Sequence, residues 1–408
     1  MEAVQYIKSV PRYLFVRALG GRWPFLSTGA LSCIRLAEVT PPALPGDSWV
    51  RIRTRLSGIC GSDLSTIRAK GSPYFSPMTS CPFVFGHEVV GDVSEVGAAV
   101  SEFVAGDRVI LEPALCCIVR GIDPVCDSCR DGAYGNCERI MHGDIAPGIQ
   151  TGYCRDTGGG WSEEFVAHAH QLHKVSDALS DEEAVLIEPF SCCVHAAIAA
   201  RPVDGDTVLV IGCGTIGLLT IAALRAIGSR CRILAVARYG HQQDLARNLG
   251  ADEVVSNRKE MYELVRTETG AESYQPEIGK PTVIGGVHGT LDCVGTAETI
   301  DDSLRLTRSH GTVAIVGMPG LPSGVDWTTI WYKELRVQGT YAYGTEHFED
   351  EQVRTFALAL RLLEEYGPLL KPLVSQTYPL SRYRAAIQNA IQAGRMGAVK
   401  VAFDLRTA

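Results

Sequence analysis

The sequence predicts two domains of different class: a mainly β domain followed by an α/β domain with a doubly wound parallel sheet. The first observation is length, because 408 residues exceed what one hydrophobic core usually supports. The second is a set of short β-rich runs between Val50 and Glu112, broken by Gly, Pro, Asp and Ser, which favours an irregular antiparallel barrel. The third is a change beyond Glu182, where strand-like and helix-like runs alternate.

The individual runs support this division. In the first half the predicted strands are Trp49–Leu56, Val89–Val96 and Arg108–Leu111. In the second half they are Thr207–Ile211, Arg232–Ala237, Leu291–Val294 and Val313–Val316, with helices Leu218–Ile227, Gln242–Leu249 and Ala297–Leu306. Residues Glu268–Gly285 have the weakest pattern and are predicted to be a loop. After Gly344 a helix over Glu351–Tyr366 leads into a mixed segment, Pro379–Phe403.

Composition excludes some classes of function. A net charge of −8, with 46% hydrophobic and 21% charged residues, is typical of a soluble globular protein without general attraction for nucleic acid or anionic membrane. Residues 1–20 lack the order of features of a secretory signal, and no apolar run reaches membrane-spanning length. We therefore expect a cytoplasmic protein, whose fourteen cysteines favour metal binding over a disulfide framework.

A glycine motif, Gly212-Cys-Gly214-Thr215-Ile216-Gly217, follows a predicted strand and precedes a predicted helix. The first glycine permits a tight turn, the second lets the backbone approach a pyrophosphate, and the third lets helix and strand pack closely. The helix N-terminus offers N–H groups to the anion. The motif in this context predicts dinucleotide binding, against the alternative of a tight turn without a ligand.

The end of the second strand bears on the choice of dinucleotide. NAD-specific domains carry an acidic residue there, but this chain has Ala237, followed by Arg238. Because no carboxylate repels a 2′-phosphate and a guanidinium is present to bind it, NADP is slightly favoured over NAD. The alternative is that Arg238 stacks on adenine or is only solvated.

Three cysteines, Cys126, Cys129 and Cys137, stand close together in a loop rich in Gly, Asp and Asn. Such spacing predicts a structural zinc, which needs a fourth ligand for a closed tetrahedral site. Cys116 and Cys117 both lie upstream, and we prefer Cys117.

A second set of potential ligands is dispersed: Cys60, the pair His87-Glu88, and Glu188. No short regular spacing links them, so spacing alone does not identify a metal site. Taken singly, His87 is equally well read as a hydrogen-bonded core histidine and Cys60 as a small buried apolar residue.

Several motifs together resemble the zinc-containing medium-chain dehydrogenase/reductase superfamily, more its sorbitol, threonine and glucose dehydrogenase branches than its liver-type alcohol dehydrogenases. These motifs are Gly58-Ile-Cys-Gly-Ser-Asp63, Gly86-His-Glu88, Gly91…Gly97, Gly106-Asp-Arg-Val109, Cys126…Cys129…Cys137, Glu188-Pro189, Gly212–Gly217, Asp292-Cys-Val-Gly295 and Val316-Gly-Met-Pro319. The resemblance implies a GroES-like irregular β-barrel catalytic domain, 1–190 completed by 345–408, around a Rossmann dinucleotide-binding domain, 191–344.

The resemblance also implies roles for residues. Cys60 and His87 would bind a catalytic zinc, with one of Glu88 and Glu188 bound directly and the other through water or by exchange. Ser62 would bond the substrate oxygen, and Asp63 would orient the ligands. Val316 and Gly317 would add to the cofactor site. The chain departs from its relatives at Ser65, where many have a proton-relaying histidine, and in the longer gap from Cys117 to Cys126.

The expected function is hydride transfer between NADP or NAD and a secondary alcohol or polyol, or the matching ketone. An open zinc site would polarise the substrate oxygen, and Ser62 would start the proton path. The alternatives are a carbonyl or imine reductase of the same fold in a specialised biosynthetic pathway and a non-catalytic dinucleotide-binding protein. The resemblance implies a homodimer or homotetramer with a small-molecule substrate.

Overall fold

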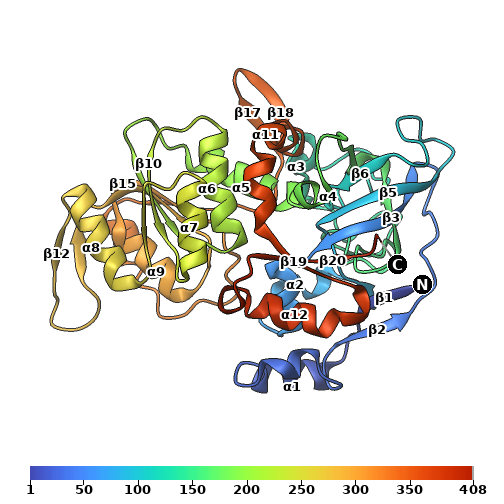
Figure 1. Ribbon diagram of the computed structural model, residues 1–408, viewed down its shortest axis with the longest axis horizontal. Helices are drawn as coiled ribbons and strands as arrows, with labels where there is room; N and C mark the ends of the chain where they lie inside the picture. Colours follow the sequence, from blue (N-terminus) through green and yellow to red (C-terminus); the bar gives the residue numbers. More distant parts are fainter. Residues whose placement is uncertain (407–408) are drawn as a thin grey trace. The chain divides into compact units, whose positions relative to one another are not determined.

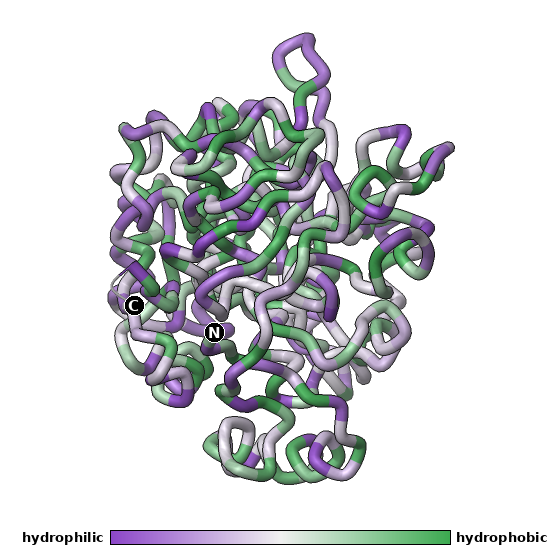
Figure 2. Tube along the Cα trace, turned by 90° about the vertical axis from the view of Figure 1, so that its right-hand side faces the viewer, coloured by the Kyte–Doolittle hydropathy of each residue, from purple (hydrophilic) through white to green (hydrophobic). Residues whose placement is uncertain are grey.

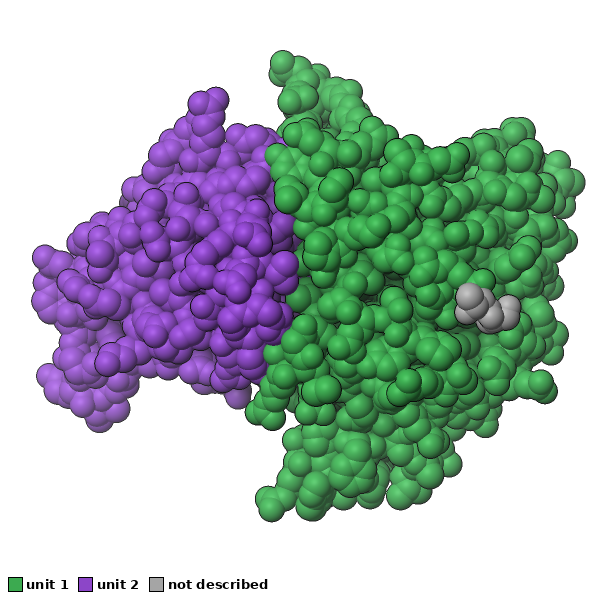
Figure 3. Space-filling model, viewed as in Figure 1, with its two compact units in different colours: residues 1–188, 343–408 green, residues 189–342 purple. Residues whose placement is uncertain are grey.

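The computed structural model describes residues 1–406 and divides the chain into two compact units. The first consists of Met1–Glu188 together with the chain from Tyr343 onward, and the second of Pro189–Ala342 (Figure 3). Each junction lies two residues before the one expected from the sequence. The first junction falls inside α5 (Ile187–Ala200), whose first two residues belong to the first unit.

The first unit is built on a mainly antiparallel sheet with the strand order β19-β20-β3-β5-β6-β8, in which β7 also pairs with β3 (Figure 1). Its strands are β3 (Trp49–Gly58), β5 (Val89–Val96), β6 (Arg108–Leu111), β7 (Glu164–His168), β8 (Leu172–Lys174), β19 (Val374–Tyr378) and β20 (Lys400–Asp404). β5 and β6 have the predicted bounds. The C-terminal β20 pairs with β3, so residues from both ends of the chain form this sheet.

A second sheet of the first unit contains an excursion that the sequence did not predict. Its strands are β1 (Glu2–Tyr6), β2 (Ile34–Glu38) and β4 (Phe83–Val84). β1 and β2 are antiparallel neighbours, yet residues 7–33 separate them. These residues form α1 (Val10–Leu19), which has a proline in its first turn, and the 3₁₀ turn η1 (Pro24–Thr28).

Helices, 3₁₀ turns and one β-hairpin complete the first unit. They are α2 (Gly61–Ile67), η2 (Pro73–Met78), α3 (Asp127–Arg130), η3 (Tyr134–Asn136), η4 (Ala169–Gln171), α4 (Asp181–Ala184), β17 (Thr345–Phe348), β18 (Glu351–Arg354), α11 (Thr355–Leu370), η5 (Lys371–Leu373), η6 (Leu380–Arg382), α12 (Tyr383–Ile391) and η7 (Ala393–Met396). The helix predicted from Glu351 was wrong in its first turn, because Glu351–Arg354 pairs with β17 across a tight turn at Glu349 and Asp350.

The second unit is a six-stranded sheet with the order β11-β10-β9-β14-β15-β16, and every neighbouring pair is parallel. Its strands are β9 (Thr207–Ile211), β10 (Arg232–Val236), β11 (Glu253–Val255), β14 (Val287–Asp292), β15 (Thr307–Ile315) and β16 (Arg336–Gly339). Its helices are α6 (Thr215–Ala226), α7 (Gly240–Asn248), α8 (Arg258–Thr269), α9 (Ala297–Leu306) and α10 (Thr328–Tyr332). The predicted fold class is confirmed.

One prediction in this unit was wrong. The segment Glu268–Gly285, predicted to be a loop, contains an antiparallel hairpin of β12 (Glu272–Tyr274) and β13 (Thr282–Ile284). Both strands have three residues and are largely exposed, so they carry no burial pattern for the sequence to reveal. Among the described residues, no helix is long and apolar enough to cross a lipid bilayer.

Candidate functional site

Cys60, His87 and Glu88 lie together in the first unit, with one potential ligand atom from each residue within 4.8 Å of the others. The sheet explains why residues so far apart in sequence meet. Ser57 of β3 is paired with Val89 of β5, and the Gly58 N–H donates to the Glu88 carbonyl at 2.8 Å. The end of β3 and the start of β5 therefore lie side by side, and the chain enters α2 through Cys60.

Glu88 is held by a lysine that the sequence reasoning missed. Lys400, the first residue of β20, forms an ion pair with the Glu88 carboxylate, and both side chains are almost fully buried. A Cβ at Gly58 would lie 2.0 Å from Glu88 Oε2, so only glycine leaves room for this pair. The signal was available, because Lys400 interrupts the apolar run Ala398–Phe403.

The imidazole of His87 is oriented from both sides. Ser62 Oγ lies 3.4 Å from Nε2, and Asp63 Oδ1 lies 3.5 Å from Nδ1. The other oxygen of Asp63 accepts the Cys60 backbone N–H at 3.1 Å. A carboxylate on one ring nitrogen fixes the tautomer in which the other nitrogen is free to bind a metal.

A second residue missed from the sequence, Tyr153, completes this arrangement. Its buried hydroxyl donates to Asp63 Oδ1 at 3.3 Å and lies 3.2 Å from Thr66 Oγ1. No motif marks Tyr153, because it belongs to an irregular loop and reaches Asp63 only in the folded chain.

The electrostatics of this cluster favour a cation. Burial lowers the pKa of His87, but the negative charges of Asp63 and Cys60 outweigh burial and raise this pKa to about 10. The electrostatic potential at the imidazole is therefore negative, which favours a bound cation. Sulfur, nitrogen and carboxylate donors gathered in one buried place are the ligands that zinc takes in proteins, so the residues fit a zinc ion.

Glu188 lies outside the group of three donors. Its Oε1 accepts the hydroxyl hydrogen of Tyr343 at 3.3 Å, and burial, opposed by the charge of His87, raises the pKa of its carboxyl to about 7. Of the two glutamates left open by the sequence, Glu88 is the one grouped with Cys60 and His87.

A separate buried cluster holds four cysteines. The sulfur atoms of Cys117, Cys126, Cys129 and Cys137 all lie within 4.8 Å of one another. Backbone N–H groups donate to three of these sulfurs, at 3.4 Å each, as suits thiolates. Cys116, the other candidate for the fourth position, is outside the group.

One buried arginine, Arg120, holds the loop around this cluster through hydrogen bonds to its backbone carbonyls. The Arg120 guanidinium donates to the carbonyls of Leu115 at 2.9 Å, Ile145 at 3.1 Å and Gly148 at 2.6 Å. A side chain thus supplies the hydrogen bonds that the irregular backbone lacks. The long gap between Cys117 and Cys126 forms a turn that returns the chain to the other cysteines.

In the second unit, the glycine motif connects β9 to α6. Gly212 has a φ of +91°, and a Cβ at Gly217 would lie 1.9 Å from the Gly212 carbonyl oxygen. Gly214 caps α6, and a Cβ there would meet nothing within 4 Å. The first and third glycines are thus required by the turn itself, whereas Gly214 leaves open space next to the helix N-terminus, where Thr215 and Ile216 begin the helix.

The other predicted cofactor residues lie at the same edge of the sheet. Ile211 is in register with Val236 and Asp292, and Asp292 with Ile315. These strands therefore end together, and the residues that follow them share one edge, namely Arg238, Val316 and Gly317 together with the glycine motif. Arg238 is exposed.

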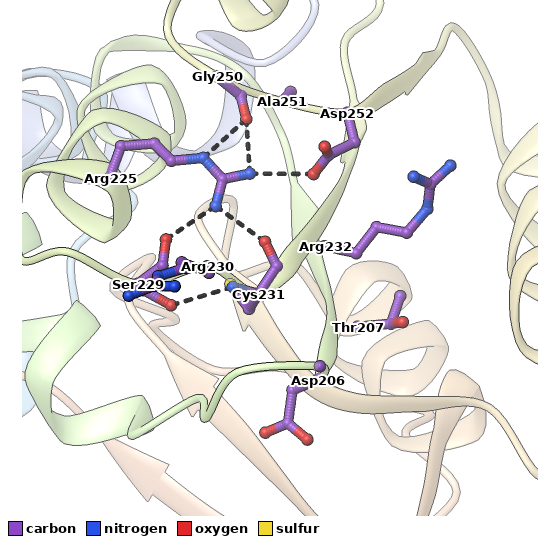
Figure 4. Close-up of a pocket in the computed structure, with 11 residues that line it drawn as sticks. Asp206, Thr207, Arg225, Ser229, Arg230, Cys231, Arg232, Gly250, Ala251 and Asp252 are labelled. Carbon is purple, nitrogen blue, oxygen red and sulfur yellow. Dashed lines mark hydrogen bonds and ion pairs between the residues drawn. The ribbon is translucent and has the colours of Figure 1, made fainter.

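A pocket of about 710 Å³ in the second unit lies at the opposite strand ends (Figure 4). Its lining includes Thr207 and Arg232, which begin β9 and β10, and none of the predicted site residues. Arg225 is bound to the Gly250 carbonyl at 2.8 Å and to Asp252 at 2.9 Å. This pocket is therefore not the candidate dinucleotide site.

Comparison with known proteins covers both units of the chain. Residues 46–177 match the family model of the alcohol dehydrogenase GroES-like domain, and residues 215–360 match that of the zinc-binding dehydrogenases. The chain is 30% identical to L-idonate 5-dehydrogenase of Vitis vinifera, covering 91% of this chain and 93% of the relative. It is 31% identical to sorbitol dehydrogenase of Arabidopsis thaliana, with the same coverage of both chains.

Among solved structures, 2R,3R-butanediol dehydrogenase from Bacillus subtilis is similar with a TM-score of 0.70 and 26% identity, covering 91% of this chain and 96% of that one. Family models and relatives together span both units. The chain therefore belongs to the zinc-containing medium-chain dehydrogenase/reductase superfamily, as an oxidoreductase that depends on zinc and on NAD or NADP.

Proposed function

We propose that this enzyme oxidises a secondary alcohol or polyol to the ketone, and catalyses the reverse reduction, at a zinc ion bound by Cys60, His87 and Glu88. The observation that carries the proposal is the buried group of three donors of different chemistry within 4.8 Å. The names of the relatives support the substrate class, since idonate, sorbitol and butanediol all carry secondary hydroxyl groups.

The chain's own residues supply the remaining functions. When bound, zinc acts as a Lewis acid on the substrate oxygen. Ser62 would hold the substrate hydroxyl and relay its proton, with Oγ accepting the substrate proton as its own hydroxyl hydrogen passes to solvent water. Asp63 keeps His87 in the required tautomer, and Lys400 positions Glu88. Glu188, which accepts a hydrogen bond from Tyr343, would support the zinc site from outside the group of direct ligands.

The four cysteines Cys117, Cys126, Cys129 and Cys137 hold a second, structural zinc. Four sulfur donors leave no position for substrate, so this site serves only the fold of its loop. The first unit is then the catalytic domain and the second the dinucleotide-binding domain.

The dinucleotide pyrophosphate binds at the N-terminus of α6, over Gly214. Arg238 binds the 2′-phosphate of NADP, because the position before it, Ala237, offers no carboxylate to the ribose. Val316 and Gly317 line the same edge of the sheet.

The test is a panel of secondary alcohols, polyols and ketones, each assayed with NADP and with NAD. Activity is measured for the wild type, for chelator-treated protein, and for the same protein after zinc is restored. His87→Ala should lose turnover but bind the dinucleotide with unchanged affinity. Full turnover in zinc-free protein, or in His87→Ala, would contradict the proposal.

We also propose a homodimer that pairs through β16. This edge strand has one neighbour, and Trp331, Tyr332 and Val337 are exposed beside or on it. An unpaired edge with exposed aromatic residues is suited to pairing with a second copy. Light scattering of wild type and Trp331→Ser/Tyr332→Ser tests this, and a monomeric wild type would contradict it.

The expected cytoplasmic location stays a prediction that cell fractionation tests.

A further inference from the structure

The excursion of residues 7–33 exposes an unusual number of large apolar side chains. Six of them, with between 36% and 62% of their surface exposed, are Val10, Leu14, Leu19, Trp23, Phe25 and Leu31. The excursion is the lowest part of Figure 1, and in Figure 2 that part alternates between hydrophobic and hydrophilic residues. A bare apolar surface of this kind usually has a binding partner.

The excursion is not a loose loop. Val16, Ser27 and Thr28 are buried, and Gln388 of α12 donates to the Pro24 carbonyl at 3.1 Å and to Thr28 Oγ1 at 2.9 Å. The Arg12 guanidinium donates to the Ser32 carbonyl at 3.2 Å. The apolar side chains are therefore exposed by a folded segment.

The charge of this region is opposite to that of the whole chain. No Asp or Glu occurs between Glu2 and Glu38, and none between Asp63 and Glu88. The two segments touch where Arg17 donates to the Ala69 carbonyl at 3.4 Å. Their seven cations are Lys8, Arg12, Arg17, Arg22, Arg35, Arg68 and Lys70.

These cations also lack ionic partners. Within residues 1–406, no carboxylate forms an ion pair with any of the seven, and Arg22 instead lies over the Trp23 ring at 5.4 Å. Five of the seven are exposed, namely Lys8, Arg17, Arg22, Arg35 and Lys70. A chain with a net charge of −8 therefore carries a locally basic surface on the same segments as the exposed apolar side chains.

We propose that residues 7–33, with Lys70, dock on the surface of an anionic lipid bilayer. The apolar side chains would enter the boundary between headgroups and acyl chains, with Trp23 at the level where tryptophan is favoured. The arginines and lysines would bind the anionic headgroups. The chain's overall negative charge does not prevent this, because surface charges act only within about a Debye length.

Two other occupants fit less well. A second copy of the chain would meet this face about a two-fold axis, which places the same unpaired cations opposite one another. Nucleic acid would satisfy the cations, but it offers no apolar medium for Val10, Leu14 and Leu31. A lipid surface accepts both kinds of side chain.

The test is co-sedimentation of the purified zinc- and dinucleotide-loaded enzyme with vesicles. Phosphatidylcholine vesicles that contain phosphatidylserine should bind the enzyme, pure phosphatidylcholine vesicles should bind it weakly, and added salt should release it. Lys8→Gln/Arg22→Gln should weaken binding roughly twenty-five-fold, since each cation near an anionic surface contributes a factor of about five.

Trp23→Ser/Phe25→Ser should also lose binding, whereas Tyr274→Ser, an aromatic of comparable exposure in the second unit, should not. All variants should keep the turnover of a small alcohol, which shows that they fold. Equal binding to both vesicle types, or none, would overturn the proposal. Self-association or nucleic-acid binding that Trp23→Ser/Phe25→Ser abolishes, without vesicle binding, would overturn it in favour of that partner.

Discussion

Lys400 and Glu88 form a buried ion pair at the one place in β3 where a side chain is missing, Gly58. The pair joins the last strand of the chain to a proposed zinc ligand. The ion pair holds one carboxylate oxygen of Glu88, so the orientation of the ligand is set by a residue more than three hundred positions away in sequence.

Lys400→Met should destabilise the zinc-free protein by about 3–5 kcal/mol, because it leaves the Glu88 carboxylate buried without a cationic partner. Glu88→Gln/Lys400→Met should recover much of this loss, since the amide carries no charge. Urea unfolding of the wild type, both single variants and the double variant gives the coupling energy. Additive effects of the two substitutions would show that the pair does not contribute.

Cys117→Ser should lose one zinc ion per chain relative to wild type, whereas Cys116→Ser should lose none. The two thiols are adjacent and both are buried, but only Cys117 lies within the cysteine group. Zinc content by atomic absorption is the measurement. The matched variant controls for general damage, and equal zinc loss in both would exclude Cys117 as the specific ligand.

Gly214→Val should fold normally and bind dinucleotide at least about tenfold more weakly. A side chain at Gly214 meets no protein atom within 4 Å, so it would enter the space left for the pyrophosphate. Gly21→Val, also in open space but in the first unit, is the control and should bind normally. Fluorescence titration with NADPH measures both, and unchanged affinity in Gly214→Val would place the ligand elsewhere.

Arg238→Gln should lower kcat/KM for NADP by about tenfold and leave that for NAD nearly unchanged. The physical reason is the loss of a charge-assisted contact to the 2′-phosphate, worth about 1.4 kcal/mol. Steady-state kinetics with both cofactors is the measurement. A parallel fall with both would instead assign Arg238 to the adenine or to the fold.

The enzyme should lose stability as the pH falls from 6.5 towards 4. Burial lowers the pKa of His168 to about 4, below that of the unfolded chain, so the unfolded state binds the proton first. His168 Nδ1 accepts the His170 N–H at 3.0 Å, a bond that an asparagine oxygen can replace.

Between pH 7 and pH 5, the free energy of unfolding should therefore fall by about 1 kcal/mol less in His168→Asn than in wild type. The difference is smaller than the pKa shift alone implies, because the ring keeps partial solvent contact. Denaturant unfolding of wild type and His168→Asn at pH 7 and at pH 5 measures this difference. An identical pH dependence would exclude His168 as the source.

Local patterns in the sequence were sufficient for the regular elements. β5, β6, β9 and α9 have the predicted bounds, because each carries a continuous or periodic set of buried residues over four or more positions. The glycine motif was equally local, since its strand, turn and helix are consecutive. By contrast, α1 has one buried residue, Val16, and each strand of the β12–β13 hairpin has three largely exposed residues, so neither element carries a clear apolar pattern.

By itself, the sequence determined the two fold classes, the family and the residue types of both proposed zinc sites, since these depend on composition, periodicity and motifs. Tertiary structure decided which of two adjacent cysteines joins the cluster, which glutamate lies beside Cys60 and His87, and that Lys400 and Tyr153 support them. These contacts join segments far apart in the chain. They follow from strand pairing and loop packing, and neither leaves a pattern in neighbouring residues.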